Sequence, residues 1–164
     1  MRRTLLAVTM AVTLALSGRG LAIDQVLNAS DFIGKSGAQA EAFLKKNAKV
    51  SQVHFDKNES GYMFQTASGT GIVIVYKGRA IAAQVEVPET DSSGALLIAL
   101  GVADPGRPTF DQHQMNLPLW IMHWDANVKP FQRAWVWRGR GANGVTTIGV
   151  TWDKAAHERW ESFR

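Results

Sequence analysis

The chain of 164 residues contains no cysteine. That absence excludes a thiolate nucleophile, a thiolate metal site and a lipid-modified N-terminal cysteine. There is also no tryptophan before position 120, and no acidic residue lies between Asp125 and Asp153. All six tryptophans therefore lie in the last 45 residues.

The first 22 residues predict a cleaved secretory signal peptide. Arg2 and Arg3 give a basic start, and small residues end the segment at Gly20–Ala22. The apolar stretch between them, Leu5–Leu16, falls short of the roughly 20 residues that span a bilayer as a helix. We therefore expect a periplasmic or secreted bacterial protein, without stable membrane insertion after cleavage.

Removal of this signal changes the charge of the protein. Arg2, Arg3 and Arg19 leave with it, so the 18 basic residues of the full chain fall close to the 14 acidic ones. The remaining chain is nearly neutral. Its overall charge gives no reason to expect a nucleic-acid partner.

Residues 23–164 predict a single α+β domain: an N-terminal helix followed by a mainly antiparallel sheet of about five to seven strands. Ser36 and Gln39 have the spacing of a capping box, which starts a short helix over 37–47. Short connections between the apolar segments favour antiparallel neighbours. The expected strands are 50–55, 62–67, 72–76, 80–87, 120–124, 134–138 and 145–152. We expect a short buried helix over 95–102, irregular structure over 104–118 and a helical turn or two over 153–164.

Residues 29–36, ASDFIGKS, fit a relaxed form of the phosphate-binding P-loop, with alanine replacing the first glycine. A P-loop follows a buried strand of a parallel sheet, and its backbone amides wrap the phosphates. Here the preceding segment, 23–28, is half polar, and the segments that follow are joined as hairpins. We interpret the stretch as the beginning of a helix and expect no cofactor.

The sequence offers little for catalysis. It lacks a Gly-x-Ser-x-Gly elbow. His113, His123 and Asp125 carry nitrogen and oxygen ligands that suit zinc or another divalent metal, although their spacing is not a recognised metal motif. A secreted hydrolase, with or without metal assistance through these residues, is kept as an alternative. A structural envelope protein is a further one.

The strongest anomaly is the stretch KPFQRAWVWRGR at 129–140. In a strand, Trp135 and Trp137 share one face, and Ala134 and Val136 share the other. If the tryptophans face outward, they form a platform flanked by cations, which suits sugar rings or an acidic protein surface. If they face inward, they are core residues and the arginines are solvated charges of a strand edge. The candidate binding residues are Trp135, Trp137, Arg133, Arg138, Arg140 and Lys129.

These observations favour an exported, non-enzymatic binding module of an inhibitor-like kind over an enzyme. Its expected ligand is a protein partner, such as an enzyme or toxin that it restrains, or a cell-envelope glycan. The export signal, the absence of a catalytic motif and the Trp/Arg-rich C-terminal region support that expectation.

Overall fold

The computed structural model describes residues 24–56, 58–88, 94–114, 119–139 and 145–161. These residues are mostly β, in one eight-stranded antiparallel sheet. The strands are β1 (Lys49–Asp56), β2 (Glu59–Gln65), β3 (Thr70–Tyr76), β4 (Arg79–Pro88), β5 (Phe110–Gln114), β6 (Leu119–Trp124), β7 (Arg133–Gly139) and β8 (Val145–Thr151). The helical elements are η1 (Ala29–Asp31), α1 (Gly37–Asn47), η2 (Ala95–Leu100) and α2 (Lys154–Glu161).

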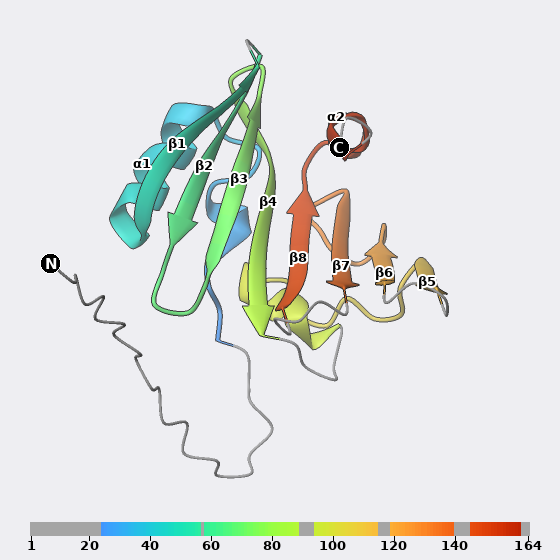
Figure 1. Ribbon diagram of the computed structural model, residues 1–164. Coiled ribbons are helices and arrows are strands. Elements are labelled where there is room, and N and C mark those ends of the chain that lie inside the picture. The colour runs from blue at the N-terminus through green and yellow to red at the C-terminus, as the bar shows by residue number, and fades with distance from the viewer. Residues whose placement is uncertain (1–23, 57, 89–93, 115–118, 140–144, 162–164) are drawn as a thin grey trace, which may run out of the picture.

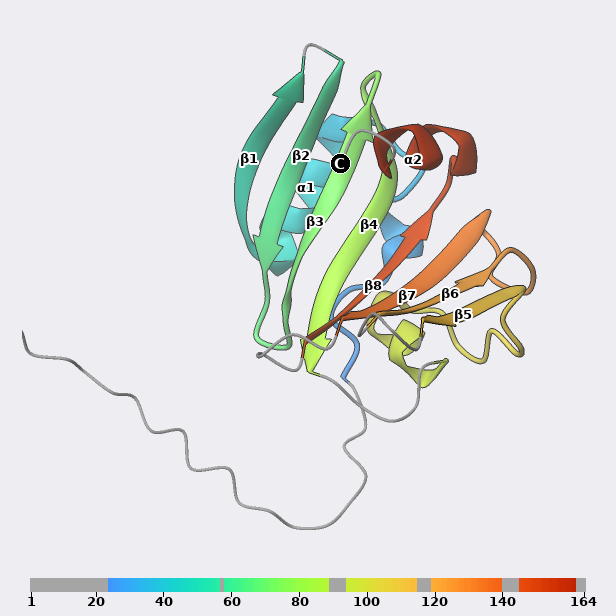
Figure 2. The ribbon, with the colours of Figure 1, turned by 45° about the vertical axis from the view of Figure 1, so that its right-hand side comes forward.

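The sheet consists of two four-stranded meanders. Its order is β1-β2-β3-β4-β8-β7-β6-β5, so the last strand of the first meander pairs with the last strand of the second. Every neighbouring pair is antiparallel. The strands twist progressively, and β1 and β5 run in clearly different directions at the two edges (Figure 1, Figure 2).

The expectation of a helix followed by a mainly antiparallel sheet is confirmed in outline, but the strand number of five to seven was too low. The missing strand is β5, inside the segment 104–118 that was expected to be irregular. Its sequence, FDQHQ, is polar and follows Pro105 and Pro108, so it lacks the apolar pattern of a strand. An edge position explains this composition, because an edge strand needs less apolar burial. The short 3-10 helix η1, which precedes α1, was not expected either.

One face of the sheet carries the main core. Helix α1 packs there through Ala40 and Leu44, against Tyr62 and Phe64 of β2 and their neighbours. The N-terminal segment, η2 and the loop after β6 cover the rest of this face. Figure 2 shows α1 behind β1–β4, with the other face of these strands turned toward the viewer.

The opposite face is covered in part only, by α2. Ala156 of that helix is buried against a second, smaller apolar cluster: Ile74, Ile81, Ala82 and Trp135. A register shift between β3 and β4 leaves Ile81 without a partner residue in β3. The carbonyl of Ile81 instead accepts hydrogen bonds from the Thr151 hydroxyl, at 2.9 Å, and the Trp152 amide, at 2.7 Å. The remainder of this surface, on both sides of α2, is called the open face below.

The stretch 29–36 forms the helix start that its sequence suggested. Ser36 caps α1: its hydroxyl accepts from the Gln39 amide, and the Gln39 side chain accepts from the Ser36 amide at 3.2 Å. The Gly34 amide donates to the Ala80 carbonyl at 2.8 Å, and the Lys35 amide donates to Phe32. Backbone amides bonded in this way are not available to wrap a phosphate.

Replacement of Ser36 by alanine should lower the free energy of unfolding by about 1 kcal/mol, because the cap of α1 is lost. Lys35→Ala should change it very little, since that side chain is exposed and the backbone bonds of residue 35 are kept. Urea denaturation of the two variants measures the difference. Equal destabilisation by both would contradict this account of the stretch.

Candidate binding surface

The two tryptophans of β7 lie on the open face, but their exposure differs. Ala134 and Val136 face the main core and are fully buried. Trp135 is only 4% exposed, whereas Trp137 is 47% exposed. The inward-facing interpretation is therefore right for Trp135, which is a core residue, and the outward-facing one is right for Trp137, which is a surface residue.

A glycine on the neighbouring strand explains the burial of Trp135. Gly149 of β8 is paired with Trp135, and the indole ring lies directly over it. A Cβ at position 149 would collide with the ring. Because the ring occupies the space of the absent side chain and also packs in the cluster beneath α2, it lies flat against the sheet.

Other apolar side chains surround Trp137 on the same face. The register of β6 and β7 pairs Trp137 with Ile121 and Trp135 with His123. On the next strand Phe110 is 46% exposed, and its ring centroid lies 5.4 Å from that of His123. We call the set Phe110, Ile121, His123, Trp135 and Trp137 the aromatic face. It is an exposed apolar surface on β5–β7, backed by one buried indole.

His123 contributes to this surface as a neutral ring. Burial of its imidazole lowers its pKa below the usual value, and the nearby positive charge of Arg133 lowers it further. The uncharged form therefore persists to lower pH than for an exposed histidine. A neutral imidazole beside the Phe110 ring is consistent with an apolar contact surface.

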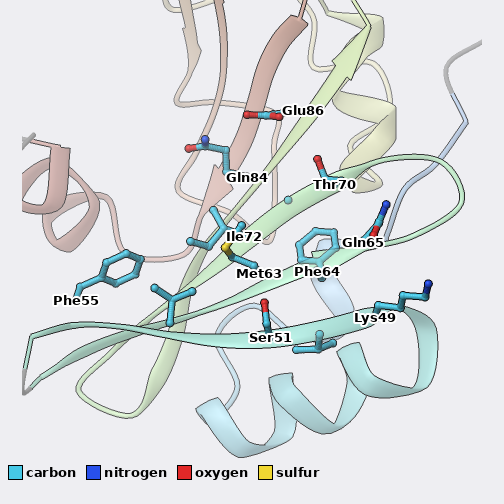
Figure 3. Close-up of a pocket in the computed structure, with 13 residues that line it drawn as sticks. Lys49, Ser51, Phe55, Met63, Phe64, Gln65, Thr70, Ile72, Gln84 and Glu86 are labelled. Carbon is cyan, nitrogen blue, oxygen red and sulfur yellow. The ribbon is translucent and has the colours of Figure 1, made fainter. Parts of the chain in front are cut away.

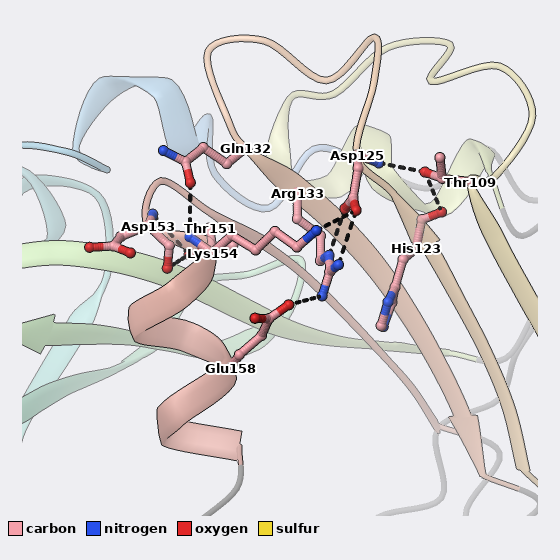
Figure 4. A network of polar contacts seen from close by, with 9 residues as sticks. All are labelled: Thr109, His123, Asp125, Gln132, Arg133, Thr151, Asp153, Lys154 and Glu158. Carbon is pink, nitrogen blue, oxygen red and sulfur yellow. Dashed lines mark hydrogen bonds and ion pairs between the residues drawn. The ribbon is translucent and has the colours of Figure 1, made fainter.

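A network of charges borders the aromatic face and holds α2 to the sheet (Figure 4). Arg133 donates to both carboxylate oxygens of Asp125, at 2.6 and 3.0 Å. Lys154, the first residue of α2, donates to Asp125 at 2.7 Å. Arg133 also reaches Glu158, one turn further along α2, at 3.1 Å. Asp125 thus links the end of β6 to both β7 and α2.

The hydrogen bonds from Arg133 hold the pKa of the Asp125 carboxyl well below its usual range, and those from Lys154 act in the same direction. Partial burial of the carboxyl raises its pKa, but by less than these hydrogen bonds lower it. Asp125 is therefore ionised throughout the neutral range, and both of its oxygens are occupied by cations of this chain. Its role here is structural.

The structure does not bring the three candidate metal ligands together. The register pairs position 113 with Trp120, and position 123 with Phe110 at the other end of β5. Positions 120 and 123 differ by an odd number of residues along β6, so they lie on opposite faces of the sheet. Among the residues that the structure describes, no group of three or more His, Cys, Asp or Glu side chains could hold a metal ion.

The basic candidates are also dispersed. Arg133 lies beside Trp135 on the open face, but its side chain is 12% exposed and is paired with Asp125 and Glu158. Position 138 pairs with Trp120 and Thr146, on the core side of the sheet. Lys129 is an exposed residue of the loop after β6. Arg140 lies outside the described residues. Among the side chains that the structure describes, no row of free cations flanks the tryptophans.

Sequence reasoning missed Phe110 and Ile121 of the aromatic face. Phe110 was hidden because β5 was not expected. Ile121 and His123 alternate with Met122 and Trp124 in β6, which shows two apolar faces but not which of them is covered. No helix within the described part of the chain is both long and apolar enough to cross a membrane.

Replacement of Asp125 by asparagine should lower the free energy of unfolding at pH 7 by about 1–2 kcal/mol, because two charge-assisted partners lose their acceptor in a half-solvated site. The pKa of the carboxyl is depressed in the folded state. Its stabilisation is therefore present above the unfolded pKa of about 3.9 and is lost as pH falls toward the folded value. The difference between wild type and variant should accordingly shrink below about pH 4.

Glu41→Gln is the matched control, because Glu41 is as exposed as Asp125, at 29%, but its ion pair with Lys45 lies within one helix, and a glutamine can still accept from the Tyr62 hydroxyl. It should destabilise the protein less than Asp125→Asn does. Urea denaturation between pH 3 and pH 7 measures both. A difference for Asp125→Asn that stayed constant across this range would contradict the role assigned to the network.

No family model matches the chain, and neither a curated protein nor a solved structure matches it. The fold and the chemistry of the open face are therefore the basis on which a function is proposed.

Proposed function

We propose that this protein is an exported binding module without catalytic activity, and that the aromatic face is its binding surface. The observation that carries the proposal is the exposure of Trp137, at 47%, and of Phe110, at 46%, on one face of β5–β7, with the half-buried Ile121 and His123 between them. Contiguous exposed apolar side chains on a soluble domain mark interaction sites. Tryptophan in particular is enriched among the residues that dominate binding energies.

Three features of the surface support a binding role. Trp135 and Gly149 fix the backing of the surface, so that Trp137 stands on a supported strand rather than a loop. Strand β7 is paired along its length with β6 and β8, so little conformational entropy is lost when a ligand binds. The charges that border it are already neutralised by each other, which favours a ligand recognised through rings and apolar area.

The partner that this chemistry fits is a protein surface with an exposed apolar group, such as an enzyme or toxin that the module restrains. A cell-envelope glycan, whose sugar rings stack on tryptophan, is the other ligand that the same surface fits. The hydrolase alternative gains no support, because Asp125 is engaged by Arg133 and Lys154, and because His113 and His123 are apart.

Trp137→Ala tests the proposal better than a double change of Trp135 and Trp137, because Trp135 is buried and its loss would unfold the sheet locally. The variant should keep the thermal midpoint of the wild type and lose retention of its partner by about tenfold or more. Binding to envelope extract of the producing bacterium, and to its isolated peptidoglycan, measures this effect with immobilised protein.

Ile98→Ala serves as the matched control, since Ile98 is an exposed apolar residue, at 37%, on η2, outside the open face. It should retain the same partner as the wild type. A partner retained equally by Trp137→Ala, or lost equally by both variants, would rule out the aromatic face as the binding surface.

Export makes a separate prediction. Full-length protein produced in a bacterium should be recovered from the periplasm or the medium with Ile23 as its first residue, because cleavage follows Gly20–Ala22. Mass spectrometry of the intact protein determines this directly. Recovery from the cytoplasm with the first 22 residues attached would contradict it.

A further inference from the structure

A second concave surface lies on the first meander, and it adjoins the aromatic face: Glu86 pairs with Thr147, which in turn pairs with Trp137. It is a groove of about 610 Å³ on β1–β4, on the side of the sheet opposite α1 (Figure 3). Its apolar floor includes Met63 and Ile72, and Phe55 stands at one end. Met63 is 52% exposed and Phe55 is 40% exposed, so these side chains are open to solvent.

The strand register orders the groove into three rows of decreasing polarity. The first row crosses the four strands as Lys49, Gln65, Thr70 and Glu86. The second row is Ser51, Met63, Ile72 and Gln84. The third row is Val53, Gly61, Ile74 and Ala82, of which only Val53 lines the groove and the others continue the sheet beyond it. One end of the groove is therefore polar and charged, and the other end is wholly apolar.

Phe55 borders the apolar end of the groove. A register shift leaves Phe55 without a partner residue in β2, and its ring lies over Gly61, where a Cβ would come within 2.9 Å of it. Ile74 and Ala82, in the third row, are fully buried in the cluster beneath α2. An amphiphile therefore fits best with its apolar end toward Phe55 and α2.

The floor of the groove provides no backbone hydrogen bonds. Strands β2 and β3 are each paired on both sides, so their amides and carbonyls are used within the sheet. A peptide lying over Met63 and Ile72 would gain no backbone hydrogen bonds from these strands, and its amides that face them would lose water without replacement. The body of a fitting ligand is therefore a hydrocarbon chain without hydrogen-bonding groups.

The polar row offers both signs of charge. Lys49 and Glu86 belong to the outermost of the four strands, so three strand spacings, about 14 Å, separate their backbones. Neither side chain forms an ion pair within the described residues. Gln65 and Thr70 lie between them and supply hydrogen-bonding groups. A head group with a negative and a positive end matches this row, its anion toward Lys49 and its cation toward Glu86.

We propose that this groove binds a single-chain amphiphile with a zwitterionic head, such as a lysophospholipid. The hydrocarbon chain lies over Met63 and Ile72 toward Phe55, and the head lies over the row from Lys49 to Glu86. The groove shares no residue with the aromatic face, and its existence does not rest on the function proposed for that surface.

Titration of the full mature chain with dodecylphosphocholine, kept below its micelle-forming concentration, tests the proposal. Methyl NMR should show saturable shifts of the Met63 and Ile72 methyl groups, and calorimetry should give one molecule bound per chain. Met63→Glu should weaken this binding by about tenfold or more, because it places a charge in the path of the hydrocarbon chain. Its thermal midpoint should stay that of the wild type, since Met63 is exposed.

Two further sets of titrations test which head group the groove prefers. Dodecyl sulfate and dodecyltrimethylammonium have the same chain but a single charge, and both should bind more weakly than the zwitterion. Lys49→Gln should reduce the preference over the cationic probe, and Glu86→Gln the preference over the anionic one, each several-fold. Trp137→Ala is the control and should bind dodecylphosphocholine as the wild type does.

Several outcomes would overturn the inference. These are shifts without saturation, shifts at the edge of β1 instead of the Met63 and Ile72 methyls, or unchanged affinity in Met63→Glu. Equal affinity for all three head groups would remove the assigned role of Lys49 and Glu86. Since Trp137→Ala should abolish partner retention but keep amphiphile binding, failure of this site and failure of the aromatic face are distinguishable.

Discussion

The antiparallel pairing of β4 with β8 is the contact on which the rest of the molecule depends. It joins two meanders that otherwise have their own hydrogen bonds, and it brings together residues as distant as Ile81 and Thr151. Such a long closure is entropically costly, so it needs strong local support. The support is the carbonyl of Ile81, which is freed by the register shift in β4 and accepts from both Thr151 and Trp152. This shared acceptor adds to the seven residue pairs of β4 and β8 that hold the second meander in register with the first.

That register also decides which side chains are available for binding. It aligns Val85 with Ile148 toward the core, and Gln84 with Gly149 toward the open face. A shift of one residue would exchange the two faces along the whole of β8. Gly149 would then no longer lie beneath Trp135, and the indole could not lie flat. The exposure of Trp137 and the burial of Trp135 are thus consequences of a pairing on the adjacent strand, not of the sequence of β7.

The local features of the fold could be predicted from the sequence, and the features that depend on distant contacts could not. The capping box of Ser36 and Gln39 and the apolar run of β3 act within a few residues, and both form as expected. Strand β5 was missed because an edge strand is specified mainly by its neighbour β6. In the candidate site, alternation placed Trp135 and Trp137 on one face. Their different exposure could not be predicted, because it depends on Gly149 and on the packing of α2.

The open face contains two glycines that are each covered by an aromatic ring. Gly61 lies beneath the ring of Phe55, and Gly149 lies beneath the ring of Trp135, each ring coming from the neighbouring strand. A glycine inside a strand weakens it, and an aromatic ring laid over the gap shields the exposed backbone and restores apolar contact. The first pair borders the groove, and the second backs the aromatic face. Because the main core lies wholly on the other side of the sheet, the exposed residues between these rings can change with little cost in stability. Such a division lets one sheet keep its fold while its open face is specialised for binding.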